Sequence, residues 1–329
     1  FAMSKAKELL RWKEWGDSKL PFVIIAWLLT SLQMPSKNAN WIVLIHSLAF
    51  SVCYLSFGYM FNDWIDSDVD KRAGKKKTIH SMQTWQVTLI LTTLIILGIG
   101  FVFPWLTNPQ VFINVLICYF FAITYSGTSL RFKERGGMGI LVASLSQRTM
   151  LVSLVFIIAE NFNVIATLFL VLTLIIGFRW MLIHQLDDYE RDLEGGVQTF
   201  TTQNSMKVSS RLLTWLFNAE IVLLISFPLL FNIIEFWIIF FLYALFTIAM
   251  SNAFSNTPWQ MLQTPSTAYL VLADFYFLYW PLGLAIIYAL YQPISWLVVF
   301  FLLILLANYI KQHLSELKFL VQRVIPSKT

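Results

Sequence analysis

Long apolar runs separated by short polar segments are the dominant pattern of this chain. A helix needs about 20 apolar residues to cross a bilayer, and ten runs come near that length. They cover residues 20–32, 41–61, 85–105, 111–125, 139–159, 164–184, 212–231, 233–252, 268–291 and 294–311. The first run is short and the seventh and eighth are barely separated, so nine is the alternative count. The pattern predicts an all-α integral membrane protein, a bundle of nine or ten transmembrane helices.

The polar ends of the chain flank this bundle. Residues 1–19 mix Lys, Arg and Glu with apolar positions and predict an interfacial helix, not a cleavable signal. Phe1 and Ala2 precede Met3 and are expected to be an expression remnant. Residues 20–314 are predicted to form a single transmembrane domain, and residues 315–329 a cytoplasmic tail.

Composition agrees with the membrane prediction. Charged residues make up 12% of the 329 residues and hydrophobic residues 58%, whereas a soluble domain carries roughly a quarter charged residues. A soluble enzyme and a disordered chain are therefore excluded. The net charge of +5 does not indicate nucleic acid, because nearly all loop Lys and Arg fall on one side of the predicted bundle and Lys37 alone on the other. By the positive-inside rule, both termini are expected in the cytoplasm, with a bacterial inner membrane as the simplest location.

Half of the acidic residues lie in two long loops on the predicted cytoplasmic side. The first group begins at Asn62, where Asp63, Asp66 and Asp70 recur at i, i+3 and i+7 and share one face of a continuing helix, while Asp68 points to the far side. Three carboxylates on one stripe repel one another, so a cation is expected between them.

The second group places Gln185, Asp188 and Asp192 on one helical face at the end of the sixth run. Carboxylate oxygens on two facing helices suit Mg²⁺, which binds through a few carboxylates together with substrate phosphates. The alternative is that each group is a hydrated loop start balanced by nearby lysines. Two groups on the same predicted side, each with in-phase spacing, favour a shared diphosphate bridged by Mg²⁺.

A third polar element follows the fourth run. Tyr125 and Ser126 precede Arg131 and Lys133, and charge-assisted donors of this kind hold phosphate well. The same cations also serve the predicted topology, so this element alone is weak evidence.

These residues resemble the UbiA-type intramembrane prenyltransferase superfamily. Asn62-Asp63-x-x-Asp66-x-x-x-Asp70 matches its first motif, NDxxDxxxD, and Asp188-x-x-x-Asp192 matches its second, DxxxD. The stretch from Tyr125 to Lys133 is similar to the tyrosine-and-basic element between the motifs. Many members carry an earlier acid in the second motif, where this chain has Gln185.

The resemblance implies Mg²⁺-dependent transfer of a prenyl group from an isoprenyl diphosphate to an acceptor, most often an aromatic ring, in a cavity facing the cytoplasm. Residues 20–314 would be the catalytic domain. The implied metal-binding and catalytic residues are Asp63, Asp66, Asp70, Asp188 and Asp192, and the implied substrate contacts are Asn62, Tyr125, Ser126, Arg131, Lys133 and Gln185.

Other functions stay open from the sequence. A terpene cyclase or a transferase using a phosphorylated sugar would fit the same scaffold. An ion-coupled transporter is less favoured, because it is expected to hold its acids near the membrane midplane on broken helices. Acceptor identity, donor chain length and oligomeric state are not legible in the sequence.

Polar residues inside predicted spans are functional or structural by default, because burying them in lipid is costly. Arg179 or Arg148 is expected to pair with Glu220 as a structural lock. Asp274 is expected near the cytoplasmic side, where it could meet the acceptor or a cation. His46 and His184 are candidate bases, although a hydrogen bond to a carbonyl is the commoner role.

Overall fold

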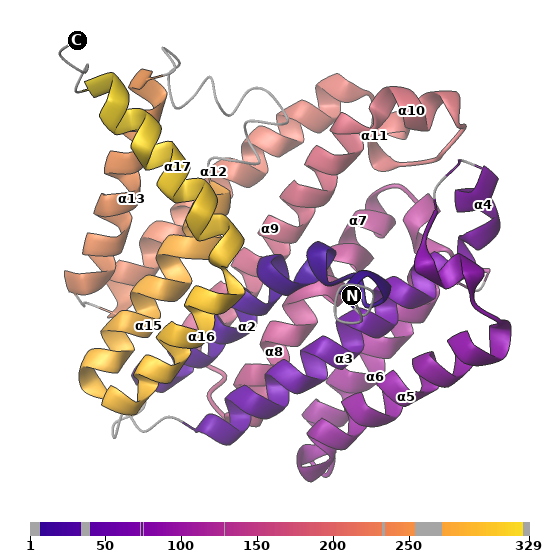
Figure 1. Ribbon diagram of the computed structural model, residues 1–329, viewed down its shortest axis with the longest axis horizontal. Helices are drawn as coiled ribbons and strands as arrows, with labels where there is room; N and C mark the ends of the chain where they lie inside the picture. Colours follow the sequence, from indigo (N-terminus) through magenta and orange to yellow (C-terminus); the bar gives the residue numbers. More distant parts are fainter. Residues whose placement is uncertain are drawn as a thin grey trace.

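The computed structural model describes residues 7–33, 40–72, 74, 76–127, 129–231, 234–253 and 272–324. Apart from one isolated β-bridge, all regular structure in these ranges is helical (Figure 1). Phe1, Ala2 and the rest of residues 1–6, Lys37, residues 268–271 of the ninth predicted run and residues 325–329 of the predicted tail lie outside the described residues. The prediction of an all-α protein is confirmed.

The longer helices follow the predicted runs in order. They are α2 (Trp12–Gln33), α3 (Trp41–Ile65), α5 (Thr84–Val102), α6 (Pro109–Ser126), α7 (Gly137–Ser144) continued by α8 (Met150–Ile158), α9 (Val164–Asp187), α12 (Met206–Phe231), α13 (Ile234–Ala253), α15 (Trp280–Tyr291), α16 (Trp296–Leu305) and α17 (Ala307–Val324). The two acid-rich loops carry the short helices α4 (Ser67–Arg72), α10 (Tyr189–Glu194) and α11 (Phe200–Asn204), and 3₁₀ turns occupy Thr78–Ser81, Phe103–Trp105, Phe132–Glu134 and Pro293–Ser295.

Seven of the described helices are long and apolar enough to cross a membrane. The count becomes eight if the pair Pro293–Leu305 and Ala307–Gln322, bent by 73° at its break, forms one span. The described part of the chain thus has the helices of an integral multi-pass membrane protein. The finer count of nine or ten spans is not confirmed, partly because the apolar part of α13, Ile234–Met250, is shorter than the others.

Helix α2 forms the centre of the bundle. Its residues from Leu20 to Leu32 are almost all buried, and it packs against α3, α8, α9 and α15. A helix that is apolar on every face is either a core helix or a lipid-facing membrane span, and the burial of α2 makes it a core helix. The first predicted span is therefore a core helix that positions the helices carrying both acidic groups.

Two spans contain a π-helical turn. In η4 (Leu145–Thr149) the turn interrupts the span formed by α7 and α8, and in η6 (Phe275–Tyr279) it precedes α15. Such turns widen a helix locally and often occur at functional sites. Both turns place polar side chains inside the bundle, Gln147 from η4 and Tyr276 from η6.

A fully buried ion pair joins α9 to α12. Arg179 donates from Nε to Glu220 Oε2 at 2.6 Å and from Nη2 to Oε1 at 3.0 Å, and the Tyr276 hydroxyl donates to Oε1 at 2.6 Å. The predicted lock is confirmed with Arg179 as the partner. Arg148 instead lies 4.1 Å from the ring centroid of Trp180.

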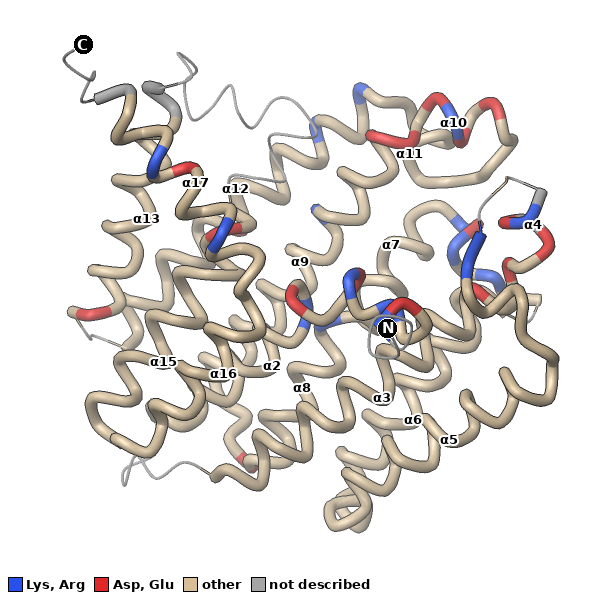
Figure 2. The backbone as a smooth tube through the Cα atoms, in the orientation of Figure 1, with Lys and Arg blue, Asp and Glu red and all other residues tan. Residues whose placement is uncertain are grey.

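Charge is unevenly distributed over the molecule. Figure 2 shows a concentration of Lys, Arg, Asp and Glu around the ends of α3, α4, α9 and α10, with further charges along α17 and near the N-terminus, whereas the opposite ends of α3, α5, α8, α15 and α16 carry very few. The two acidic groups therefore lie on the same side of the bundle.

Candidate active site

The first acidic group lies where α3 passes into α4. Although α3 ends at Ile65, helical hydrogen bonding continues, with Asp66 N donating to Asn62 O at 3.0 Å and Asp70 N to Asp66 O at 2.8 Å. The side chains of Asp63 and Asp70 are buried. The three carboxylates thus keep the helical spacing that the sequence predicts.

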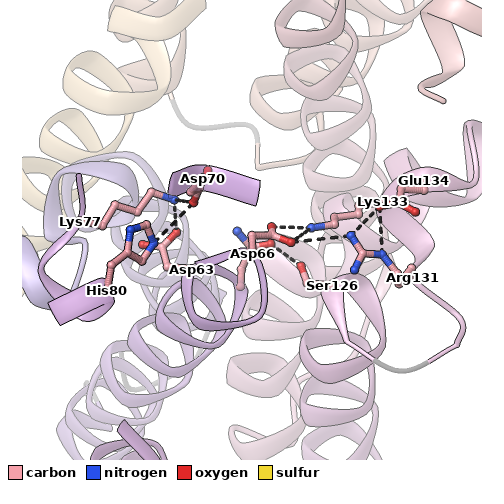
Figure 3. Close-up of polar contacts among 10 residues, drawn as sticks. Asp63, Asp66, Asp70, Lys77, His80, Ser126, Arg131, Lys133 and Glu134 are labelled. Carbon is pink, nitrogen blue, oxygen red and sulfur yellow. Dashed lines mark hydrogen bonds and ion pairs between the residues drawn. The ribbon is translucent and has the colours of Figure 1, made fainter. Parts of the chain in front are cut away.

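Positive charge lies between these carboxylates, as their mutual repulsion predicts. Lys77 Nζ donates to Asp63 Oδ1 at 2.6 Å and to Asp70 Oδ2 at 2.5 Å (Figure 3). Arg11 Nη1 lies 3.4 Å from Asp63 Oδ2, and His80 Nε2 lies 3.8 Å from Asp70 Oδ2. Burial by itself lowers the pKa of Lys77, but the hydrogen bonds to the two carboxylates outweigh it, so the pKa is raised above its ordinary value.

Asp66 faces a different set of cations. Lys133 Nζ donates to both of its carboxylate oxygens, at 2.5 Å to Oδ1, and Arg131 Nη2 lies 3.7 Å from Oδ1 while also binding Glu134. Figure 3 shows Asp66 pointing toward these residues and away from Lys77. The predicted basic element therefore contacts the first acidic group directly.

The amide and hydroxyl residues of the two elements also meet. Ser126 Oγ at the end of α6 donates to Asn62 Oδ1. This contact links the end of the fourth predicted span to the first residue of the acidic motif. Both residues were predicted as substrate contacts, and the structure brings them together.

The second acidic group lies at the junction of α9 and α10. Asp188 pairs with Arg191 and with His184 Nδ1, the latter at 3.2 Å. Burial raises the pKa of Asp192, and the nearby Asp188 carboxylate raises it further. Gln185 Oε1 accepts a hydrogen bond from Thr201 N at 3.3 Å, so this amide holds α11 against α9.

The basic element also touches the segment that follows the second acidic group. Gly136 forms an isolated parallel bridge with Thr199, and its φ of +52° is a conformation that favours glycine. A cavity of about 550 Å³ lies between residues 129–135, which include Arg131, and residues 195–198. The segments that carry the three sequence motifs are thus joined through the α6–α7 connection.

A second cavity, of about 330 Å³, runs into the bundle beside the first acidic group. Its lining combines polar side chains, such as Asn62 and His184, with aromatic and apolar ones, such as Tyr54, Leu55 and Tyr125. Residues from α3, α6 and α9 therefore face one space whose walls are partly aromatic and apolar. His184, one of the candidate bases, is part of this lining, whereas His46 Nδ1 contacts the carbonyl of Phe101.

The five predicted metal ligands do not form a single cluster in the structure. In the described ranges, no three of these aspartates bring ligand atoms within 4.8 Å of one another. The first three are neutralised by lysine and arginine side chains instead. Their oxygen donors suit a hard cation such as Mg²⁺, and the lysine ammonium that bridges Asp63 and Asp70 shows that this position accepts positive charge. Their role as metal ligands stays a prediction.

Sequence reasoning gave Arg11 and Lys77 only a topological role. In the structure both bind Asp63, and Lys77 also binds Asp70. For Lys77, the signal is the run of lysines directly after the acidic motif, combined with the expectation that three carboxylates need a cation. Nothing in the local pattern of residues 7–15 singles out Arg11.

The comparisons with known proteins agree with the motifs. A model described as the UbiA prenyltransferase family matches residues 20–261. The curated proteins that were compared with this chain include no match.

Solved structures resemble the chain in fold. One concerns the biosynthesis of digeranylgeranylglyceryl phosphate synthase in membranes, with 16% identity, 86% of this chain and 98% of that chain covered, and a TM-score of 0.61. A UbiA homologue from Archaeoglobus fulgidus bound to GPP and Mg²⁺ has 14% identity, coverage of 90% and 99%, and a TM-score of 0.60. A UbiA homologue from Aeropyrum pernix K1 in its apo form has 14% identity, coverage of 85% and 97%, and a TM-score of 0.59. At these identities the likeness is one of fold.

Proposed function

Because the chain belongs to the UbiA prenyltransferase family, we propose that it transfers a prenyl group from an isoprenyl diphosphate to an acceptor within the membrane. The observation that carries this proposal is the arrangement around Asn62, where buried carboxylates, lysines and a cavity with partly aromatic walls adjoin one another. An aromatic ring is the favoured acceptor, and a bacterial inner membrane with a cytoplasmic active site is the favoured setting.

In this proposal Asp63, Asp66, Asp70, Asp188 and Asp192 hold Mg²⁺. The ion would neutralise negative charge that develops on the leaving diphosphate. The A. fulgidus homologue is described as bound to GPP and Mg²⁺, which supports this ligand pair here.

The basic element would contact the diphosphate directly. Lys133 and Arg131 now neutralise Asp66, and phosphate oxygens offer them equivalent partners. Fixed positive charge at the point where charge develops lowers the barrier to breaking the allylic C–O bond. Tyr125 and Ser126, with Asn62 and Gln185, would orient the headgroup.

The cavity beyond Asn62 would receive the prenyl chain. Its lining includes Tyr54 and Tyr59 along α3. Ring faces stabilise an allylic cation and apolar walls exclude water that would trap it. The acceptor then reacts at the carbon released from the diphosphate, and the proton that the acceptor loses goes to a base such as His184, which lines the cavity.

The proposal is tested by turnover of purified protein with Mg²⁺, labelled geranyl diphosphate and a panel of aromatic acceptors. Asp63→Ala and Asp188→Ala should each reduce product formation by roughly hundredfold or more, with unchanged elution in detergent. Asp68→Ala, at an exposed position of α4, is the matched control and should retain activity. Undiminished turnover in both Asp63→Ala and Asp188→Ala would refute the assignment.

The same assay without acceptor separates transfer from cyclisation. Release of a cyclic hydrocarbon from the donor alone would replace the transferase by a terpene cyclase. Product formed only with a phosphorylated sugar would indicate a transferase that uses such a sugar.

A further inference from the structure

A second group of metal-ligating side chains lies away from the acidic motifs. Asp274 precedes η6, and His313 and Glu316 lie on α17. One ligand atom from each lies within 4.8 Å of the other two, and in the described residues this is the one group of three or more His, Cys, Asp or Glu with that property. Figure 1 shows α17 at the opposite end of the bundle from α4 and α10, so this group is separate from the candidate active site.

The histidine is buried and has an unsatisfied nitrogen. His313 is 7% exposed, and its Nδ1 atom has no hydrogen-bond partner. Its other nitrogen, Nε2, lies 2.9 Å from the Tyr279 hydroxyl. A buried ring nitrogen without a partner is costly, and here it points between two carboxylates.

The distances fit metal ligands better than direct hydrogen bonds. Nδ1 of His313 lies 3.6 Å from Glu316 Oε2 and 3.9 Å from Asp274 Oδ2. Charge-assisted hydrogen bonds are about 2.7–2.9 Å long, so these gaps are too wide. Ligand atoms around a tetrahedral zinc ion lie roughly 3.3–3.5 Å apart, given bond lengths near 2.0–2.2 Å, so a small contraction would close the site.

The surrounding contacts prepare the three groups for coordination. If Nε2–H donates to the Tyr279 oxygen, the lone pair of His313 is on Nδ1, which is the tautomer that a metal requires. Gln312 Nε2 donates to Glu316 Oε1 at 3.0 Å, which leaves Oε2 directed at the cluster. Phe246 packs on the imidazole with ring centroids 4.2 Å apart and fixes its orientation.

We propose that Asp274, His313 and Glu316 bind a divalent transition-metal ion of the zinc class, which fastens α17 to η6. One imidazole nitrogen with two carboxylate oxygens favours Zn²⁺ over Mg²⁺, because imidazole is a poor ligand for the harder ion. The chain bends by 73° between α16 and α17, just before the site. A metal ion bound there would hold α17 against η6 after this bend.

Zinc content tests the proposal independently of activity. The parent protein for this test is the full chain with Asp63→Asn and Asp188→Asn, which weaken metal binding at the candidate active site. It is stripped of metal with a chelator, reloaded with Zn²⁺ in excess Mg²⁺, and desalted. One zinc ion per chain is expected. Adding His313→Asn should remove it, whereas the matched control Glu235→Gln, an acid in the first turn of α13, should retain it.

Zinc affinity and thermal stability of conservative variants provide a second test, in case His313→Asn folds poorly. Tyr279→Phe removes only the hydroxyl beside Nε2 and should weaken zinc binding by roughly 10–100-fold, and Asp274→Asn and Glu316→Gln should each weaken it at least as much. Zinc should raise the thermal midpoint of the parent protein and leave that of His313→Asn unchanged. Equal zinc content with and without His313, or zinc affinity indifferent to all three conservative variants, would overturn the proposal.

Discussion

The ammonium of Lys133 donates to both carboxylate oxygens of Asp66, a residue 67 positions earlier in the chain. This contact joins the α6–α7 connection to the acidic motif at the end of α3. It neutralises a carboxylate that is also beside Arg131. The basic element and the first motif are therefore one electrostatic unit.

Replacing Lys133 should weaken donor binding. Lys133→Gln removes a cation proposed to contact diphosphate, and a hydrogen bond to a charged group contributes about 1.5–3 kcal/mol. We expect the KM for prenyl diphosphate to rise roughly tenfold or more, measured by steady-state turnover, whereas Lys133→Arg should keep most of the affinity. Equal KM values for wild type and Lys133→Gln would contradict the contact.

The buried pair of Arg179 and Glu220 should be essential for stability. Glu220→Gln leaves the guanidinium without its counter-charge, and breaking a buried pair costs about 3–5 kcal/mol. Unfolding in detergent should show this loss. The double variant Arg179→Met/Glu220→Leu should be more stable than Glu220→Gln, because no charge is left unpaired. A double variant as unstable as the single one would argue against charge as the cause.

Lys77 should make the stability of the folded protein fall as the pH rises in the alkaline range. Its pKa is raised in the folded protein above the ordinary value of 10.5, so the contribution of Lys77 is fully present below pH 10.5 and is lost as pH rises through the folded-state pKa. The thermal midpoint of wild type should therefore exceed that of Lys77→Gln at pH 8, and the difference should shrink above pH 10.5. A difference that is constant across this range would be inconsistent with the ion pairs.

Gly136 should not tolerate a side chain. Its φ of +52° is strained for other residues, and an added Cβ would meet the Gln203 side chain. Gly136→Ala should destabilise the protein by about 1–3 kcal/mol and should lower turnover by shifting the basic element. Gly100→Ala is the control, because Gly100 is helical and has nothing within 4 Å of an added Cβ; similar losses in both would rule out a local effect.

Much of this architecture could be predicted from the sequence, because it depends on local periodicity. The apolar runs predict the helices, and the i, i+3 and i+7 spacing predicts that one cation can bind both Asp63 and Asp70. The spacing alone did not predict that Asp66 turns toward Lys133 and Arg131 and away from Lys77. The expectation of a cation between them also follows from repulsion alone.

The identity of that cation could not be predicted. Lys77 reaches the carboxylates through a turn and a 3₁₀ helix, Thr78–Ser81, whose path has no periodic signal. For the same reason the sequence allowed either Arg148 or Arg179 as the partner of Glu220. Contacts between distant helices depend on packing, and the sequence periodicity of either helix does not determine that packing.

The group of Asp274, His313 and Glu316 shows the same limit. Asp274 was singled out as a charge inside a predicted span, but its neighbours come from α17, beyond two helices and a sharp bend. Part of α17 was assigned to a cytoplasmic tail. The π-helical turns likewise have no signature in the sequence that distinguishes them from ordinary helix.

The full burial of Arg179 and Glu220 has a consequence for how the protein enters the bilayer. A lone charge at the centre of an inserting helix costs about 2.5–3.5 kcal/mol, and α9 and α12 each carry one. Pairing Arg179 with Glu220 offsets this cost for both helices at once, so association of α9 with α12 is favoured as they enter the bilayer.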